Sequence, residues 1–119
     1  MPYHSFEELE IWKRGCRMAV DLCRELASCP NFSLRDQMQR AAISIPSNIA
    51  EGAERDSVAD FAKFLRYAKG SAGELRTQAY IAIRLDLMDR AKGEAFVQEL
   101  RELGAMIQGL IFALTKSEN

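Results

Sequence analysis

The stretch FVQELRELGAMIQGLIFAL, residues 96–114, carries the most regular apolar pattern in the chain. Its large apolar side chains recur at alternating spacings of four and three residues: Phe96, Leu100, Leu103, Ile107, Leu110 and Leu114. This spacing keeps one face of an α-helix apolar over the whole stretch, as in coiled coils. Asp89 precedes the stretch at a position suited to capping the helix. The sequence therefore predicts a long amphipathic helix that packs against other helices.

The segment before it shows the same periodicity. Ser57 and Asp60 predict a helix start, and the helix is expected to run to about Leu87. Gly70 and Gly73 lie beside its apolar face, where we expect them to let another backbone approach closely. The apolar face keeps heptad spacing and consists of Phe61, Leu65, Ala68, Ala72, Leu75, Ala79 and Ala82.

The second helix in chain order is predicted to start at Ser33 and Asp36. Its apolar face consists of Met38, Ala42, Ile45 and Ile49. Pro46 removes one backbone hydrogen bond, but the apolar period continues beyond it, so we predict a kink and not a break. Gly52 is a candidate end signal.

The N-terminal segment predicts one more helix. Ser5 and Glu8 have the spacing of a capping box, and Pro30 should stop the helix. Its expected apolar face consists of Leu9, Trp12, Cys16, Ala19, Cys23 and Leu26. No segment alternates apolar and polar residues with β-branched enrichment, so we expect an all-α protein. Short connections between four helices predict an antiparallel up-down-up-down bundle, kinked at Pro46, that forms a single domain over residues 1–119.

Composition and charge narrow the function. The chain has 16 basic and 17 acidic residues, a net charge of −1, which gives no global attraction for nucleic acid. Local basic faces keep that hypothesis open: Lys13, Arg14, Arg17 and Arg24 in the first helix, and Lys63, Arg66, Arg76 and Arg84 in the third. No apolar run reaches the ~18 residues of a membrane span, so no membrane partner is expected.

The cysteines and the histidine bear on location and cofactors. Cys16, Cys23 and Cys29 are an odd number, and no signal peptide precedes them, which predicts a reduced, cytoplasmic protein. His4 is the single histidine, so a di-iron bundle with Glu-x-x-His pairs is excluded. We expect no metal and no cofactor.

Two polar stripes border the apolar faces of the second and third helices. One consists of Gln37, Ala41, Ser44, Asn48 and Glu51, and the other of Tyr67, Ser71, Glu74 and Gln78. Arg40 and Arg55 or Lys69 could pair with their carboxylates and amides. Three interpretations stay open: a hydrogen-bonded network that fixes helix register or a subunit contact, a ligand site, and acid–base catalysis by Glu51 and Glu74. For catalysis, the sequence offers no nucleophile, metal ligand set or cofactor motif beside Glu51 and Glu74.

The run QMQRAAISIPSNIAEG, residues 37–52, leads to a family resemblance. Together with the later residues Arg55, Phe61, Phe64, Leu65, Ala68, Lys69, Gly70, Ser71, Glu74 and Leu75, it resembles the signature of the 23S rRNA intervening-sequence family, also called the S23 family. The resemblance implies a small bacterial cytosolic four-helix bundle that forms a ring-shaped homo-oligomer, a pentamer. The family has no agreed biochemical activity.

We therefore expect a non-enzymatic protein that acts through protein–protein contacts or as a scaffold, with itself as one partner. The alternative is a nucleic-acid-associated protein that binds rRNA or the ribosome. The family-motif polar residues are the candidate site, and they are Gln37, Arg40, Ser44, Asn48, Glu51, Arg55, Ser71 and Glu74.

Overall fold

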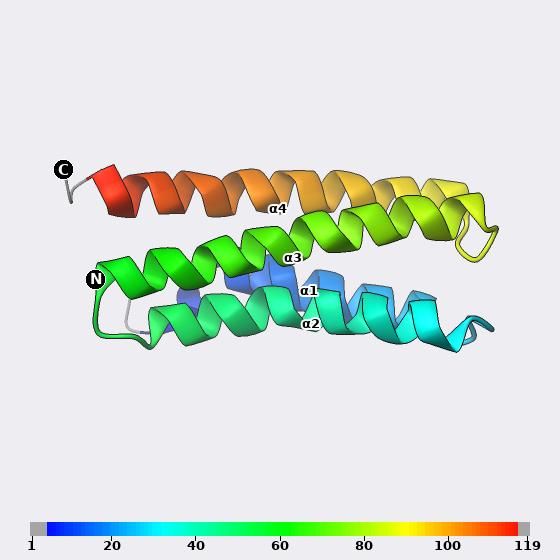
Figure 1. The fold of residues 1–119 in the computed structure, drawn as a ribbon, viewed down its shortest axis with the longest axis horizontal. Helices are drawn as coiled ribbons and strands as arrows, with labels where there is room; N and C mark the ends of the chain where they lie inside the picture. Colours follow the sequence, from blue (N-terminus) through cyan, green and yellow to red (C-terminus); the bar gives the residue numbers. More distant parts are fainter. Residues whose placement is uncertain (1–4, 117–119) are drawn as a thin grey trace.

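A computed structural model describes residues 5–116 as four packed α-helices after one short 3-10 turn. The turn is η1 (Phe6–Glu8), and the helices are α1 (Glu10–Glu25), α2 (Phe32–Ala53), α3 (Val58–Arg84) and α4 (Arg90–Lys116). The described residues contain no strand. The helices lie along the long axis of a body measuring 46 × 21 × 20 Å, and each connection lies at one end of it (Figure 1).

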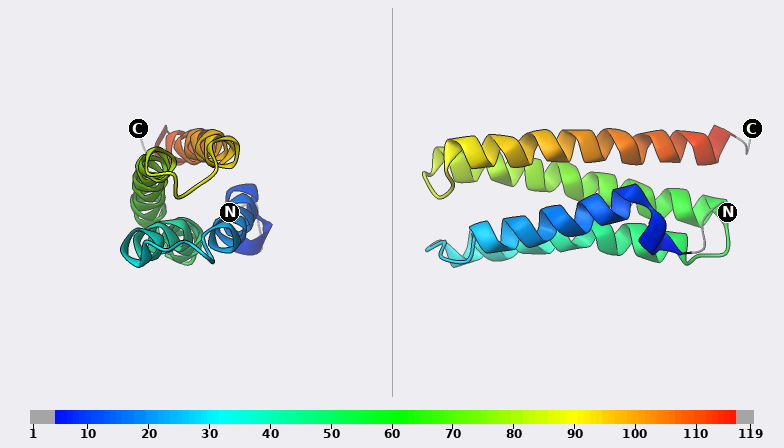
Figure 2. Two further views of the ribbon diagram at one scale, coloured as in Figure 1. Left: turned by 90° about the vertical axis from the view of Figure 1, so that its right-hand side faces the viewer. Right: turned by 180° about the vertical axis from the view of Figure 1, so that it is seen from behind.

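Seen end-on, the helices surround a common core in chain order, so that α1 ends up beside α4 (Figure 2). Packing is most extensive between α2 and α3 and between α3 and α4, and least extensive between α1 and α4. The core is continuous, and the largest fully buried side chains come from all four helices: Leu22, Leu26, Met38, Ile45, Ile49, Phe61, Leu65, Leu75, Leu100, Leu103 and Ile107.

The apolar faces predicted for α2 and α3 are confirmed, because every one of their predicted residues is buried. The face predicted for α4 is right only at its centre. Val97 and Ile111 are buried, whereas Phe96, Leu110 and Leu114 are only partly buried.

The short α1 explains the partial exposure of Leu110 and Leu114, whereas Phe96 lies opposite the middle of α1, where α1 and α4 pack loosely. The pairs Arg14–Glu102 and Lys92–Glu25 set the register of α1 against α4. At an equal rise per residue, the first residue of α1, Glu10, lies opposite residue 106 or 107 of α4, about three turns before α4 ends at Lys116. The C-terminal end of α4 therefore extends past α1, and its outward apolar side chains are half exposed.

The predicted face of α1 is wrong at two positions. Cys16 and Cys23 are only half-buried, whereas Ile11, Met18 and Leu22 are buried. Gly15 supplies the physical reason: a Cβ at this glycine would lie 3.4 Å from Cβ of Pro46. The close approach of α2 at this point turns the Gly15 side of α1 inward.

Helix starts were predictable to within a few residues. Ser57 accepts a hydrogen bond from the Asp60 amide at 3.0 Å, and Asp89 accepts one from the Lys92 amide at 3.1 Å, as predicted. For α2 the prediction was wrong, because Asn31 and not Ser33 caps the helix. Ser5 caps η1, and the extended backbone of Leu9 delays α1 until Glu10.

Two helices end earlier than predicted. Helix α1 ends at Glu25 and not near Pro30, and a turn over Leu26–Cys29 follows it. Helix α3 ends at Arg84 and not at Leu87, because Asp86 adopts a left-handed conformation with φ 57°. The amides of Asp86 and Leu87 bond back to the carbonyls of Ile83 and Ala82, which forms a Schellman motif.

Two glycines in the core keep helices close together. Helix α2 is helical through Pro46 and ends one residue after Gly52. A Cβ at Gly52 would lie 2.7 Å from Cβ of Phe64, and one at Gly93 would lie 2.5 Å from Cγ1 of Ile83. These distances are below van der Waals contact, so neither position accommodates a larger residue without movement.

Gly70 and Gly73 were expected to let another backbone approach closely, and within the described chain this prediction is wrong. Nothing lies within 4 Å of a Cβ placed at either residue, so no helix of the described chain approaches them. A glycine in a helix interior costs about 0.5–1 kcal/mol relative to alanine. That cost is not offset by packing inside the bundle.

Candidate functional site

The family-motif residues lie on the surface of α2 and α3. Five of them have exposed side chains and three are half-buried, and none of them is in the core. The exposed residues are Gln37, Arg40, Glu51, Arg55 and Glu74, and the half-buried residues are Ser44, Asn48 and Ser71.

Their hydrogen bonds are local. The bonds are Ser44 Oγ to the Ala41 carbonyl (2.8 Å), Asn48 Nδ2 to the Ser44 carbonyl (2.8 Å), Gln37 Nε2 to Ser33 Oγ (3.5 Å), Arg55 Nη2 to Glu51 Oε1 (3.0 Å) and Gln78 Nε2 to Glu74 Oε1 (3.4 Å). Over residues 5–116, no hydrogen bond of these motif residues crosses from α2 to α3. A network that joins helices or subunits through these residues therefore stays a prediction.

The expected basic partners behave differently from one another. Arg55 pairs with Glu51, as predicted, and its guanidinium also lies 4.7 Å from the centre of the Phe64 ring. Lys69 does not reach the stripes, because its Nζ donates to Gln108 of α4 at 2.7 Å. Arg40 has no hydrogen bond or ion pair to another described residue.

Gln78, at the end of the stripe in α3, is an unusual side chain. It is only 7% exposed, and its Oε1 has no hydrogen-bond partner among the described residues. A buried amide oxygen without a partner costs about 1–3 kcal/mol relative to a satisfied one. The motif surface thus includes one acceptor that the single chain leaves unsatisfied.

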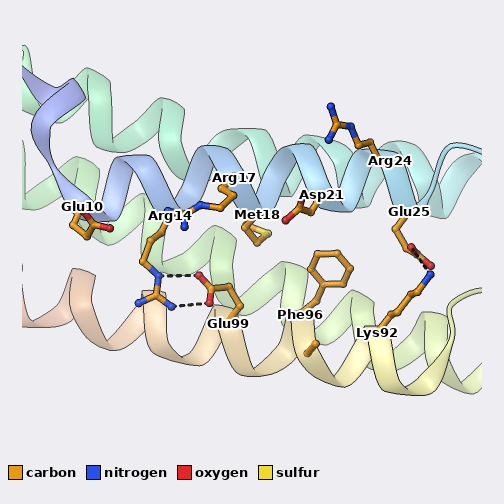
Figure 3. A pocket seen from close by; sticks show the side chains of 11 residues that line it. Glu10, Arg14, Arg17, Met18, Asp21, Arg24, Glu25, Lys92, Phe96 and Glu99 are labelled. Atoms are coloured by element: carbon orange, nitrogen blue, oxygen red, sulfur yellow. Dashed lines mark hydrogen bonds and ion pairs between the residues drawn. The ribbon is translucent and has the colours of Figure 1, made fainter.

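A pocket lies between α1 and α4, the pair of neighbouring helices that pack least (Figure 3). It has a volume of about 850 Å³. Met18 and Phe96 contribute the large apolar side chains of its lining, and charged side chains of both signs surround them. The charged side chains are Glu10, Arg14, Arg17, Asp21, Arg24, Glu25, Lys92 and Glu99.

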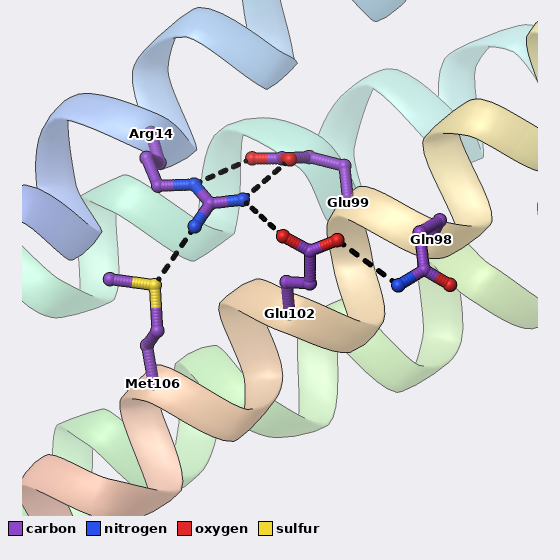
Figure 4. Close-up of polar contacts among 5 residues, drawn as sticks. All are labelled: Arg14, Gln98, Glu99, Glu102 and Met106. Atoms are coloured by element: carbon purple, nitrogen blue, oxygen red, sulfur yellow. Dashed lines mark hydrogen bonds and ion pairs between the residues drawn. The ribbon is translucent and has the colours of Figure 1, made fainter.

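Arg14 lines this pocket and bonds to side chains of α4 (Figure 4). Its Nε and Nη2 donate to the two carboxylate oxygens of Glu99 at 2.9 and 2.6 Å, and Nη2 also contacts Glu102 at 3.2 Å. Nη1 lies 3.1 Å from the sulfur of Met106. Bidentate geometry makes Arg14–Glu99 the strongest ion pair between α1 and α4. Arg14 belongs to the basic face that the sequence suggested for nucleic-acid binding, but here its charge is paired with Glu99.

The carboxylates and the burial of the site shift three pKa values. The hydrogen bonds that Arg14 donates to the Glu99 carboxylate raise the pKa of Arg14 above its ordinary value, and the bond to Glu102 adds to this effect, whereas burial opposes it. Hydrogen bonds from Gln98 and Arg14 lower the pKa of Glu102. Burial raises the pKa of Cys16, so that its thiol stays protonated to higher pH.

Sequence analysis missed Glu99 as a partner of Arg14. The two residues are 85 positions apart, so no local spacing could have paired them. A weaker signal was available, because Arg14 and Glu99 both border an apolar helix face.

His, Cys, Asp and Glu side chains are the residues from which a metal site or an acid–base site would be built. Over residues 5–116, no group of three or more His, Cys, Asp or Glu side chains could hold a metal ion. His4 lies outside the described residues. Glu51 and Glu74 bond to Arg55 and Gln78, within their own helices. None of the helices within residues 5–116 has the length and apolar character needed to span a bilayer.

Comparison with known proteins identifies the family. A solved structure from Bacteroides thetaiotaomicron VPI-5482, described as a protein with unknown function from the S23 ribosomal protein family, superposes with a TM-score of 0.79. The two sequences are 23% identical, and the match covers 85% of this chain and 94% of that one. This likeness shows the shared fold. No curated protein matches the chain.

The family model for the 23S rRNA-intervening sequence protein matches residues 7–109, which include α1, α2, α3, most of α4 and the whole polar motif. With this match, the chain belongs to the 23S rRNA-intervening sequence protein family.

Proposed function

We propose that this protein is a non-enzymatic, cytosolic protein whose antiparallel up-down-up-down bundle assembles into a ring-shaped homo-oligomer, a pentamer. In this proposal it acts through protein–protein contacts, as an interaction or scaffold protein. The observation that carries the proposal is the surface position of the motif. Residues 37–52 and 71–74 contribute polar side chains that bond only within their own helices, so they are available to another chain.

Three features of the same two helices support a protein contact. Ile43 and Tyr67, on the same two helices, are 52% and 49% exposed. Gly70 presents bare backbone to open space, and Gln78 holds a buried acceptor that lacks a partner. Exposed apolar side chains together with unsatisfied polar groups are typical of a surface that another chain covers.

The size of the bundle suits such a contact. One long side measures 46 by 21 Å, an area on the order of 900 Å², which is close to the roughly 800 Å² that each partner buries in a standard stable interface. A ring requires each subunit to use two different faces that close after a fixed number of copies. The α2–α3 face would be one of the two.

The expected kink in α2 belongs to the same proposal. Pro46 has no amide hydrogen to donate to the Ala42 carbonyl, and its ring crowds that carbonyl. A bend at Pro46 would reorient the second half of α2, which carries Asn48 and Glu51, toward a neighbouring subunit.

Light scattering of purified protein tests the proposal. Chains of 13.4 kDa would give a pentamer of about 67 kDa. Ser71→Arg places a long cation at the half-buried centre of the α3 stripe and should reduce the mass of the particle. Ala91→Arg adds the same charge at an exposed position in the first turn of α4 and should leave the mass unchanged. A wild-type mass of one chain at micromolar concentration would exclude the assembly.

A further inference from the structure

A second, narrower groove lies between α3 and α4. It has a volume of about 370 Å³, and buried Ala72 and Leu100 contribute its apolar lining. The other residues that line it are Lys69, Gly73, Arg76, Arg101, Gly104, Ala105 and Gln108.

The groove is basic, although the chain is not. Lys69, Arg76 and Arg101 line it, and none of its described lining residues is acidic. The whole chain has a net charge of −1, so the composition conceals this concentration of positive charge. Cations along a low-dielectric groove raise the local concentration of anions.

The cations are held in place without being neutralised. Lys69 Nζ donates to Gln108 Oε1 at 2.7 Å, and Arg101 Nη2 donates to the Tyr80 hydroxyl at 2.8 Å. Both acceptors are neutral, so the positive charges remain. Arg76 is half-buried and has no hydrogen bond or ion pair to another described residue. A partly desolvated guanidinium without a partner is favourable only if an anion joins it.

Bare backbone lies beside these cations. Nothing lies within 4 Å of a Cβ placed at Gly73 or at Gly104. Both glycines weaken their helices without improving packing inside the bundle. The absence of side chains at these two positions keeps the groove open, so that a ligand can reach the helix backbone between the cations.

We propose that this groove binds a linear chain of phosphates, as found in the backbone of a single nucleic-acid strand. At a rise of 1.5 Å per residue, Lys69 and Tyr80 are about 16 Å apart along α3. A single phosphate is too short to reach from one to the other, so a chain of phosphates fits this length better. A groove of about 370 Å³ is too small to seat a helix, which is roughly 10–12 Å across with its side chains. Tyr80, 37% exposed beside Arg101, offers a ring on which a base can stack. This activity goes beyond the proposed self-assembly.

Fluorescence anisotropy with a labelled single-stranded RNA of about 20 mixed nucleotides tests the proposal, at salt concentrations from about 25 to 250 mM. The key variant is Arg76→Gln with Arg101→Gln. Its matched control is Arg17→Gln with Arg24→Gln, which removes the same charge from exposed positions in α1. Gly73→Leu fills the groove without changing any charge. Circular dichroism verifies that each variant is folded, and light scattering verifies that each has the wild-type mass.

We expect wild-type protein to bind at low salt with a log–log salt slope of about −2, the value for three phosphate contacts on a single strand. The double groove variant should bind at least about tenfold more weakly with a slope nearer −0.7, whereas the α1 control should stay within about twofold. Gly73→Leu should also weaken binding.

Competitors distinguish the sources of the phosphate chain. Displacement of the RNA by single-stranded DNA or by inorganic polyphosphate supports binding of a phosphate chain. The competitor that displaces the RNA at the lower concentration indicates which kind of phosphate chain the groove prefers. Equal displacement by polyglutamate would overturn the proposal in favour of an acidic protein segment. No binding at the lowest salt, or equal losses in the groove variant and the α1 control, would overturn it as well. Assembly is read from the mass alone, so either proposal can fail without the other.

Discussion

Replacing Gly52 with alanine should destabilise the bundle, although alanine is the better helix former. Gly52 lies near the end of α2, against the beginning of α3. The new Cβ would lie 2.7 Å from Cβ of Phe64, 3.1 Å from Cδ1 of Phe61 and 3.2 Å from the carbonyl oxygen of Phe61. Two of these atoms are fixed to the backbone of α3, so a rotamer change cannot relieve the overlap.

Two opposing effects determine the size of the loss. Overpacking a core typically costs about 1–3 kcal/mol, and here the cost is at the upper end because α2 and α3 must separate. The gain in helix propensity from glycine to alanine is at most about 1 kcal/mol. The net expectation is that Gly52→Ala lowers the free energy of unfolding by about 1–2 kcal/mol.

Gly73→Ala is the matched control. It makes the same substitution inside a helix where nothing lies within 4 Å, so it should stabilise by up to about 1 kcal/mol. Urea denaturation followed by far-UV circular dichroism measures the free energy of unfolding of both variants. One fixed protein concentration is used, because the proposed assembly would make stability depend on concentration. If both variants gain stability by similar amounts, the close packing of α2 on α3 at Gly52 is refuted.

Two further predictions concern the contact between α1 and α4. Arg14→Met should lower the free energy of unfolding by about 1–3 kcal/mol in the same urea assay, because it leaves Glu99 without its partner. The control Arg90→Met breaks an exposed pair with Glu94 and should lower the free energy of unfolding by less than about 0.5 kcal/mol. Equal effects would contradict the special role of Arg14. The pKa of Glu102 is lower in the folded state than in the unfolded state, so its ionised carboxylate stabilises the fold above the unfolded-state pKa. This stabilisation disappears as the pH falls through the folded-state pKa. In acid unfolding, wild type should therefore lose its stability advantage over Glu102→Gln below about pH 4. If the stability difference between wild type and Glu102→Gln does not change with pH, this role of Glu102 is contradicted.

The sequence predicted the helices and the parts of the core that local periodicity determines. Ser57 and Asp89 cap their helices as expected, because a cap depends on residues only three positions away. The central apolar residues of α4, such as Leu103, are buried because they face the core at any register. Half-exposed Phe96 could not be predicted, since its environment depends on where the shorter α1 lies.

For the motif residues, the position beside the apolar face was predictable, but the contacts were not. Helical spacing placed Ser44 and Asn48 beside the apolar face, and both are half-buried there. Periodicity does not show whether such a side chain bonds across helices or back to its own backbone, and here both bond back. Lys69 and Gln108 come from helices that meet only in the folded chain, so their hydrogen bond had no sequence signal.

The function that we propose for the motif surface requires self-assembly. The most direct test is the absolute mass of the wild-type particle, measured by light scattering at micromolar concentration and two salt concentrations. We predict a salt-stable oligomer close to 67 kDa, about five chains of 13.4 kDa. Salt should have little effect, because the exposed apolar side chains Ile43 and Tyr67 contribute to the contact. A particle of one chain at both salt concentrations would contradict the central claim.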